Sequence, residues 1–113
     1  VSLFMDPDLD QIKRAADIGA DRIEFYTGPF ADHFPNHGSI LPAFIESATF
    51  ASSLGLGLNA GHDLNLANLD TFCRQVPGIN EVSIGHAIIT DALWMGLSTS
   101  VKKYRKILDD LKK

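Results

Sequence analysis

The sequence alternates four times between a short apolar run and a longer segment with helical periodicity. β-branched and other apolar residues dominate the runs, whereas the segments between them repeat their apolar residues every three or four positions. Strands that read as apolar on both faces and alternate with helices are typical of a parallel sheet in an α/β fold. The predicted strands are residues 1–5, 21–26, 56–60 and 79–84.

Helix signals follow the predicted strands. Asp6 is expected to cap the first helix, with Pro7 in its first position and Gly19 as its stop. After the last strand, Gly96 separates a short apolar helix from a longer one. The remaining predicted helices cover residues 42–54, 66–76, 87–95 and 97–113.

One segment, residues 30–41, shows no usable periodicity and is predicted to be a long loop. Loops of this length inside a compact domain are usually lids or binding elements. His33 and His37 lie on it, but Pro35 between them excludes the helical geometry that would let both bind one metal ion. We therefore read both as surface histidines and predict no metal site.

Four strand–helix units amount to half of an eightfold barrel, and 113 residues suffice for a single domain at most. Alone, such a half leaves two unpaired sheet edges and one uncovered face. We therefore expect a partner: either the chain is the C-terminal portion of one about twice as long, or it associates with another copy. The start at Val1, already within a predicted strand, favours a piece of a longer polypeptide.

Charge and composition narrow the function classes. The net charge of −4 argues against nucleic acid, and the basic residues 102–106 read as a solvated helix face. Cys73 is the single cysteine and lies on an apolar stripe, which fits an inert packed thiol in a reducing cytoplasm. No signal peptide is visible in this sequence, and no apolar run approaches the roughly 18 residues that span a membrane. The sequence contains no motif that is typical of nucleotide, redox-cofactor or metal binding.

Two histidines next to glycine stand where predicted strands end. His62 follows Gly61 after the third strand, and His86 follows Gly85 after the fourth. The carboxyl ends of barrel strands form the active-site face, glycine lets a ligand approach the backbone, and imidazole exchanges protons near neutral pH. We expect His62 to act in catalysis or ligand contact, with a structural hydrogen bond as the alternative. Asp63 either faces the same site or caps the next helix.

The short helix after the fourth strand predicts an anion site. The N–H groups at Gly85 and His86 would point at a phosphate, which the helix dipole favours, and barrel phosphate sites often use such an extra helix. Glu24, in the middle of an apolar strand, is a candidate functional carboxylate; an exposed position or an ion pair with Arg22 are the alternatives. Thr27, where that strand ends, could contact substrate.

Several motifs together resemble the C-terminal half of the pyridoxine 5′-phosphate synthase family. The similarity runs over essentially the whole chain in the same order. Its most specific part is Asn-Ala-Gly-His followed at this spacing by Ile-Gly-His-Ala-Ile. The matching segments are residues 1–7, 23–28, 48–51, 54–56, 59–62 and 84–89.

The resemblance implies a TIM (β/α)8 barrel with extra helices, of which this chain supplies about the last four βα units. It also implies homo-oligomers that condense 1-deoxy-D-xylulose 5-phosphate with 3-amino-2-oxopropyl phosphate, giving pyridoxine 5′-phosphate, phosphate and water without metal or organic cofactor. His62 matches the family's proton-donating histidine, and Glu24 matches the glutamate that stabilises the transition state. Gly85 and His86 match the pair that binds the aminoketone phosphate, and Asp63 occupies the substrate-binding position after the histidine.

Two positions depart from the family pattern. Asp63 stands where members usually have glycine, and its charge is unfavourable near a phosphate; Tyr26 stands where they commonly have histidine. The other proton acceptors and the deoxyxylulose phosphate site belong to the family's N-terminal half, so we expect no activity from this chain alone. The alternative is a non-catalytic half-barrel that self-associates and binds a phosphorylated small molecule.

Overall fold

A computed structural model describes residues 1–111, and its four parallel strands form one sheet in the order β1-β2-β3-β4. Each strand pairs in parallel with the next along the chain, so β1 and β4 are the edges of the described sheet. The parallel sheet that the sequence predicts is thereby confirmed. The strands are β1 (Ser2–Met5), β2 (Arg22–Tyr26), β3 (Gly57–Gly61) and β4 (Ile79–Ser83).

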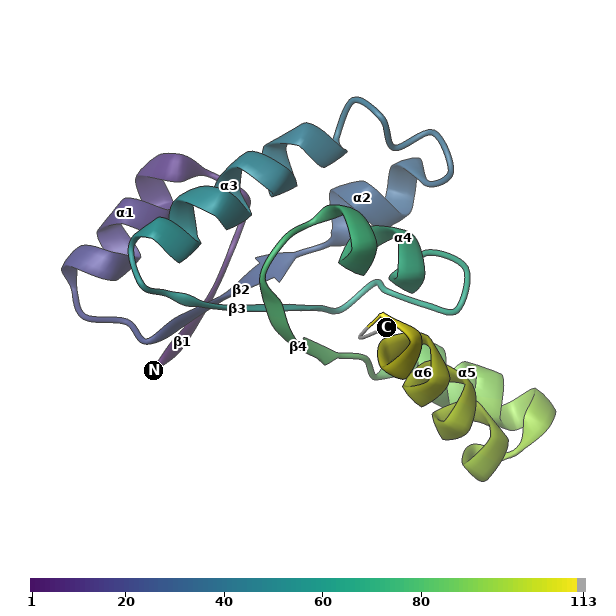
Figure 1. Cartoon of the computed structure of the whole chain (residues 1–113). Helices are drawn as coiled ribbons and strands as arrows, with labels where there is room; N and C mark the ends of the chain where they lie inside the picture. Colours follow the sequence, from purple (N-terminus) through teal and green to yellow (C-terminus); the bar gives the residue numbers. More distant parts are fainter. Residues whose placement is uncertain (112–113) are drawn as a thin grey trace.

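Helices lie on one face of this sheet and beyond its β4 edge (Figure 1). Four of them cover one face: α1 (Leu9–Asp17), α2 (Gly28–His33), α3 (Leu41–Ser53) and α4 (Leu69–Gln75). The other two, α5 (His86–Met95) and α6 (Leu97–Asp110), pack against each other beyond β4. Residues 112 and 113 of the predicted last helix lie outside the described residues. Most of the opposite face of the sheet is open in the described part of the chain.

Successive residues of each strand face the covered and the open side in turn. In β2, Ile23 and Phe25 are fully buried, whereas Arg22 and Glu24 are partly exposed. Glu24 pairs in register with Asn59 of β3, and Asn59 pairs with Glu81 of β4, so the three residues form one row on the open side. Glu81 in this row is exposed. The expectation of strands that are apolar on both faces is therefore wrong for the open side, because the helices bury one side only.

Aromatic rings join the sheet to its helices. Phe25 of β2 meets Phe44 of α3 edge-on with ring centroids 5.7 Å apart, and Phe44 meets Phe72 of α4 at 5.3 Å. Phe72 in turn meets Phe30 of α2 at 5.1 Å. All four rings are fully buried, so this row holds three helices in fixed positions over the strands.

The first helix begins later than predicted. Asp8, rather than Asp6, caps α1, because its carboxylate accepts hydrogen bonds from the N–H groups of Asp10 at 2.9 Å and Gln11 at 3.3 Å. Asp8 also has the extended backbone of a cap residue, with φ −128° and ψ 119°. Pro7 consequently lies before the helix and not in its first turn.

Residues 30–41 are not wholly the predicted loop. They begin within α2, a six-residue helix whose Phe30 is fully buried. A helix this short is not stable by itself, so burial in the tertiary structure and not local periodicity stabilises it. His33 is exposed as predicted, but His37 is partly buried and stacks on Phe34 with ring centroids 5.1 Å apart.

Candidate functional site

A hollow of about 640 Å³ lies on the open side of the sheet, where the strands end. Four separate parts of the chain meet there: Phe4 from β1, Glu24 from β2, His62 after β3, and the end of β4 with the Gly85–His86 segment that follows it. Glu24 and His62 therefore lie on the same side of the sheet. Its full lining is Phe4, Glu24, His62, Val82, Ser83, Ile84, Gly85 and His86.

Glu24 reaches this hollow because it belongs to the open-side row of β2, where it pairs in register with Asn59 of β3. Arg22, the predicted ion-pair partner, donates instead from its guanidinium to Asn59 Oδ1 at 3.1 Å. No ion pair joins Arg22 to Glu24 in the described part of the chain. The Glu24 carboxylate is thus partly buried beside the hollow and is not neutralised by its nearest cation in sequence.

His62 is placed by a tight approach of two strands. A Cβ on the preceding Gly61 would lie 2.5 Å from the backbone oxygen of Ser83, so only glycine fits there. His62 itself has φ +82° and is the one residue other than glycine with positive φ among residues 1–111. Its N–H donates to the Ser83 carbonyl at 3.1 Å, and its ring meets the edge of Tyr26 with centroids 5.9 Å apart.

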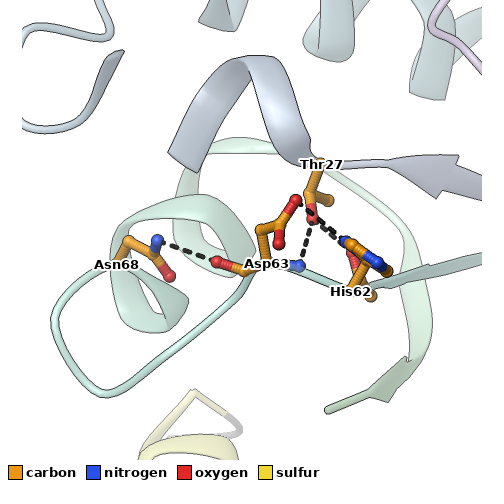
Figure 2. A network of polar contacts seen from close by, with 5 residues as sticks. Thr27, His62, Asp63 and Asn68 are labelled. Atoms are coloured by element: carbon orange, nitrogen blue, oxygen red, sulfur yellow. Dashed lines mark hydrogen bonds and ion pairs between the residues drawn. The ribbon is translucent and has the colours of Figure 1, made fainter. Parts of the chain in front are cut away.

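Asp63 and three neighbours form a polar network around His62 (Figure 2). The Asp63 carboxylate lies 2.9 Å from His62 Nδ1, and the Asp63 N–H donates to the Thr27 hydroxyl oxygen at 3.3 Å. The Thr27 hydroxyl donates to the carbonyl of Gly61, while the Asn68 amide donates to the carbonyl of Asp63 at 3.3 Å. Side chains therefore hold the carbonyl of Gly61 and both the N–H and the carbonyl of Asp63.

A second hollow of about 520 Å³ lies on the other side of His62. His62 and His86 border both hollows, whereas Asp63 borders the second and Glu24 the first. His62 thus borders one hollow together with each carboxylate residue. The second hollow is completed by the loop after β3 and the first turns of α5, with Leu64, Asn65, Leu66, Ala67, Ala87, Thr90 and Asp91.

Gly85 and His86 form the start of α5. Gly85 is the cap residue, its carbonyl accepts from the N–H of Ile89 at 3.2 Å, and no side chain caps this helix. No atom within 4 Å would obstruct a Cβ on Gly85, so the space around the first turn is open. Free N–H groups and the positive end of the helix dipole are therefore presented to both hollows.

Two residues act differently from the predictions made for them. Thr27 borders neither hollow: it is fully buried, and its hydroxyl is engaged by Gly61 and Asp63. Asp63 does not cap the next helix, since α4 starts only after Asn68 and has no side-chain cap.

Asn68 and Asn59 were missed by the sequence reasoning. Asn68 is buried, and its Oδ1 accepts from the N–H of Asn65 at 2.8 Å. The Asn-x-x-Asn spacing of a side-chain turn was the available signal for Asn68. Asn59 carried no such local signal, because its partner Arg22 lies 37 positions away.

Cys73 lies away from both hollows, on α4. It is partly buried, and burial raises the pKa of its thiol to about 11, with the Asp70 carboxylate adding to the effect. A thiol in this state has little thiolate at neutral pH, so it behaves as packing and not as a nucleophile.

Two other kinds of site are absent from the described part of the chain. Among residues 1–111, no three His, Cys, Asp or Glu side chains are grouped so that they could hold a metal ion. No helix in that range combines the length and apolar character that crossing a bilayer requires.

Comparisons with known proteins identify the family. The family model for "Pyridoxal phosphate biosynthesis protein PdxJ" matches residues 1–110. A protein of Xanthomonas axonopodis pv. citri named pyridoxine 5′-phosphate synthase is 54% identical over 111 residues, which are 96% of this chain and 43% of that protein. Proteins of the same name from Bacteroides fragilis and Cytophaga hutchinsonii are each 48% identical; the matches cover 95% and 100% of this chain and 46% and 47% of the relatives. The chain thus spans less than half the length of these relatives, and it belongs to the PdxJ family of pyridoxal phosphate biosynthesis proteins.

Proposed function

We propose that this chain forms one half of the active site of a pyridoxine 5′-phosphate synthase. The reaction is the condensation of 1-deoxy-D-xylulose 5-phosphate with 3-amino-2-oxopropyl phosphate to give pyridoxine 5′-phosphate, phosphate and water. The names of the relatives support the activity, since each is called pyridoxine 5′-phosphate synthase. One structural observation carries it: Glu24, His62, Gly85 and His86 line the same hollow although they lie on three separate segments.

The position of each group supports the role that we propose for it. His62 is the proton donor, because its half-exposed imidazole stands between the two hollows and reaches ligands in either. Glu24 stabilises positive charge that develops on the substrate, since no ion pair to Arg22 neutralises its carboxylate. Gly85 and His86 hold the aminoketone phosphate at the uncapped start of α5. Asp63 borders only the second hollow, so any contact it makes with substrate comes from that side.

The complete pocket requires a complementing half, which closes the open side of the sheet into a barrel. Three observations support this part of the proposal. β1 and β4 are edges without a neighbour in the described sheet. The helices cover one face only. The relatives contain more than twice the matched length, so they have residues enough for the other half.

Complementation tests the function. The 113-residue chain is produced together with the part of the Xanthomonas relative that precedes the matched region, and assembly is followed by size-exclusion chromatography. Both substrates are then supplied and pyridoxine 5′-phosphate is measured by chromatography. We expect product from the assembled pair and none from either half.

Two matched histidine variants sharpen this test. His62→Ala should lower the rate by at least about a hundredfold, because a positioned acid–base group contributes about that much. His33→Ala should leave the rate unchanged, since His33 is exposed on α2 and borders neither hollow. An assembled pair that makes no product, or a His62→Ala pair as active as the wild type, would contradict the proposal.

A second candidate is a non-catalytic half-barrel that self-associates and binds a phosphorylated small molecule. The observation that favours it is an apolar surface on α5 and the start of α6, formed by Ile89, Leu93, Trp94 and Leu97, of which Trp94 is 87% exposed. This candidate predicts a stable oligomer of the chain alone that Trp94→Lys dissociates, and phosphate binding without turnover in any complemented pair. Analytical ultracentrifugation and the product assay distinguish it from the synthase.

A further inference from the structure

The peptide segment that carries His62 is held more firmly than a loop normally is. His62 adopts the left-handed backbone conformation at φ +82°, which residues with a Cβ rarely take up. Hydrogen bonds fix the groups on both sides of it: its own N–H binds Ser83, and the Asp63 N–H binds Thr27. A backbone held in an unfavourable conformation by partners on β4 and in the core indicates that the direction of this side chain matters.

The side chain itself is held by Asp63 (Figure 2). The carboxylate oxygen lies 2.9 Å from His62 Nδ1, which makes the two groups an ion pair when the ring is protonated. Asp63 is in turn fixed at its carbonyl by Asn68, a buried residue whose own amide oxygen is engaged by Asn65. The Asp63 backbone is therefore anchored in the core, which limits where its carboxylate can lie relative to the His62 ring.

The chemistry of the contact selects one form of the imidazole. A carboxylate only accepts hydrogen bonds, so the Nδ1 that faces it must carry hydrogen. In the neutral ring, Nε2 is then the unprotonated nitrogen, and in the imidazolium form the Nε2 proton is the one free to leave. Because Asp63 does not border the first hollow whereas His62 does, the nitrogen left for that hollow is Nε2.

We propose that Asp63 is a positioning residue: it holds the His62 ring with hydrogen on Nδ1, so that Nε2 serves the hollow beside Glu24. During proton transfer the Nε2–H bond breaks, the proton passes to the substrate, and Nδ1–H stays on its bond to Asp63. This assignment rests on the proposed function only in taking His62 as the proton-transferring group. It also gives the Asp63 carboxylate a use other than substrate binding.

The tautomer can be measured without any activity. Histidine labelled with ¹⁵N is introduced into the 113-residue chain, and the ring nitrogen shifts are recorded at about pH 8.5, where an ordinary imidazole is neutral. The His62 signals are identified by their loss in His62→Ala. We expect hydrogen on Nδ1 in the wild type and a shift toward the Nε2–H form in Asp63→Ala. Asp70→Ala, which removes a carboxylate paired with Arg74 on α4, is the control and should leave the tautomer unchanged.

Asp63→Ala removes only the carboxylate, because the Thr27 and Asn68 bonds are made by the Asp63 backbone. Unchanged amide signals of Thr27 and Asn68 will show that the segment keeps its structure. A His62 ring that carries hydrogen on Nε2 in the wild type, or one whose tautomer is the same in Asp63→Ala, overturns the proposal.

A kinetic measurement on the complemented pair follows. Asp63→Ala should lower kcat by at least about tenfold with little change in KM, and His62→Ala/Asp63→Ala should be no slower than His62→Ala, because both act through one group. A change confined to KM would show that Asp63 acts on the bound substrate, which contradicts a positioning role. If the pair makes no product while the Nδ1–H tautomer depends on Asp63, the proposed function fails and the hydrogen-bond assignment stands.

Discussion

Replacing Gly61 with alanine tests the close approach of β3 and β4 on which the position of His62 depends. The new Cβ would lie 2.5 Å from the Ser83 carbonyl oxygen and 3.2 Å from the Ser83 Cβ. A comfortable contact is about 3.5 Å, so the strands must separate by about 1 Å. Overpacking of this kind costs about 1–3 kcal/mol. The separation also weakens the 3.1 Å hydrogen bond from His62 to Ser83, which adds about 1 kcal/mol.

We therefore expect Gly61→Ala to lower the free energy of unfolding by about 2–4 kcal/mol, and the melting temperature by roughly 10 °C. Urea titration and thermal melting followed by circular dichroism measure both quantities. Gly38→Ala is the matched control, because a Cβ added to Gly38 would meet no atom within 4 Å and the residue has no positive φ. The control should change the free energy of unfolding by less than about 0.5 kcal/mol.

The result that refutes the reasoning is a Gly61→Ala chain as stable as Gly38→Ala. Equal stabilities would mean that β3 and β4 lie further apart at Gly61 than the structure indicates. The direction of His62 and the shape of the hollow that it lines would then also be wrong, since the same strand contact sets both.

Three other predictions test the core, the Cys73 thiol and the Tyr104 hydroxyl. Phe72→Ala should lower the free energy of unfolding, measured by urea titration, by about 3–5 kcal/mol, because it leaves a cavity at a fully buried position. Phe4→Ala, at a 57% exposed position, should lower it far less. Similar losses for the two variants would contradict the difference in burial. Since burial raises the pKa of Cys73 from 9.0 to about 11, iodoacetamide at about pH 8 should alkylate it about a hundredfold more slowly in the native chain than in urea, as mass spectrometry would record. Burial, with the hydrogen bond to Asp91, raises the pKa of Tyr104, so the folded chain retains this proton when the unfolded chain loses it. Stability should therefore fall as the pH rises above about 10, and less steeply in Tyr104→Phe; identical pH dependence would refute this.

Strand positions could be predicted because their signals are local. Ile23 and Phe25 belong to an apolar run that predicted the second strand, and the structure buries both completely. Gly96 separates the last two helices as predicted, with φ +87°, a value that glycine adopts without strain. Parallel pairing then brings the strand ends to one edge, which is why His62 and Gly85 could be expected near each other from the sequence.

The contacts that shape the site could not be predicted in the same way. The Thr27 hydroxyl donates a hydrogen bond to Gly61, which lies 34 positions further along the sequence. Arg22 binds Asn59, 37 positions away, and forms no ion pair with nearby Glu24 in the described part of the chain. Nothing in either segment alone specifies these partners. The short helix α2 is a similar case, since the burial of Phe30 stabilises it and the apolar residues of this segment show no helical periodicity that would predict it.

By itself, the sequence determined the order of the strands and of every helix except α2, the parallel sheet, and the strand ends at which glycine and histidine stand together. These features depend on the spacing of apolar residues and on backbone preferences, which act over a few positions. Only the tertiary structure decided which face of the sheet stays open, that Asp63 turns to His62 instead of capping α4, and that Thr27 supports the site from within the core. Those outcomes arise from packing between distant segments, where the burial of one side chain determines the partners left for another.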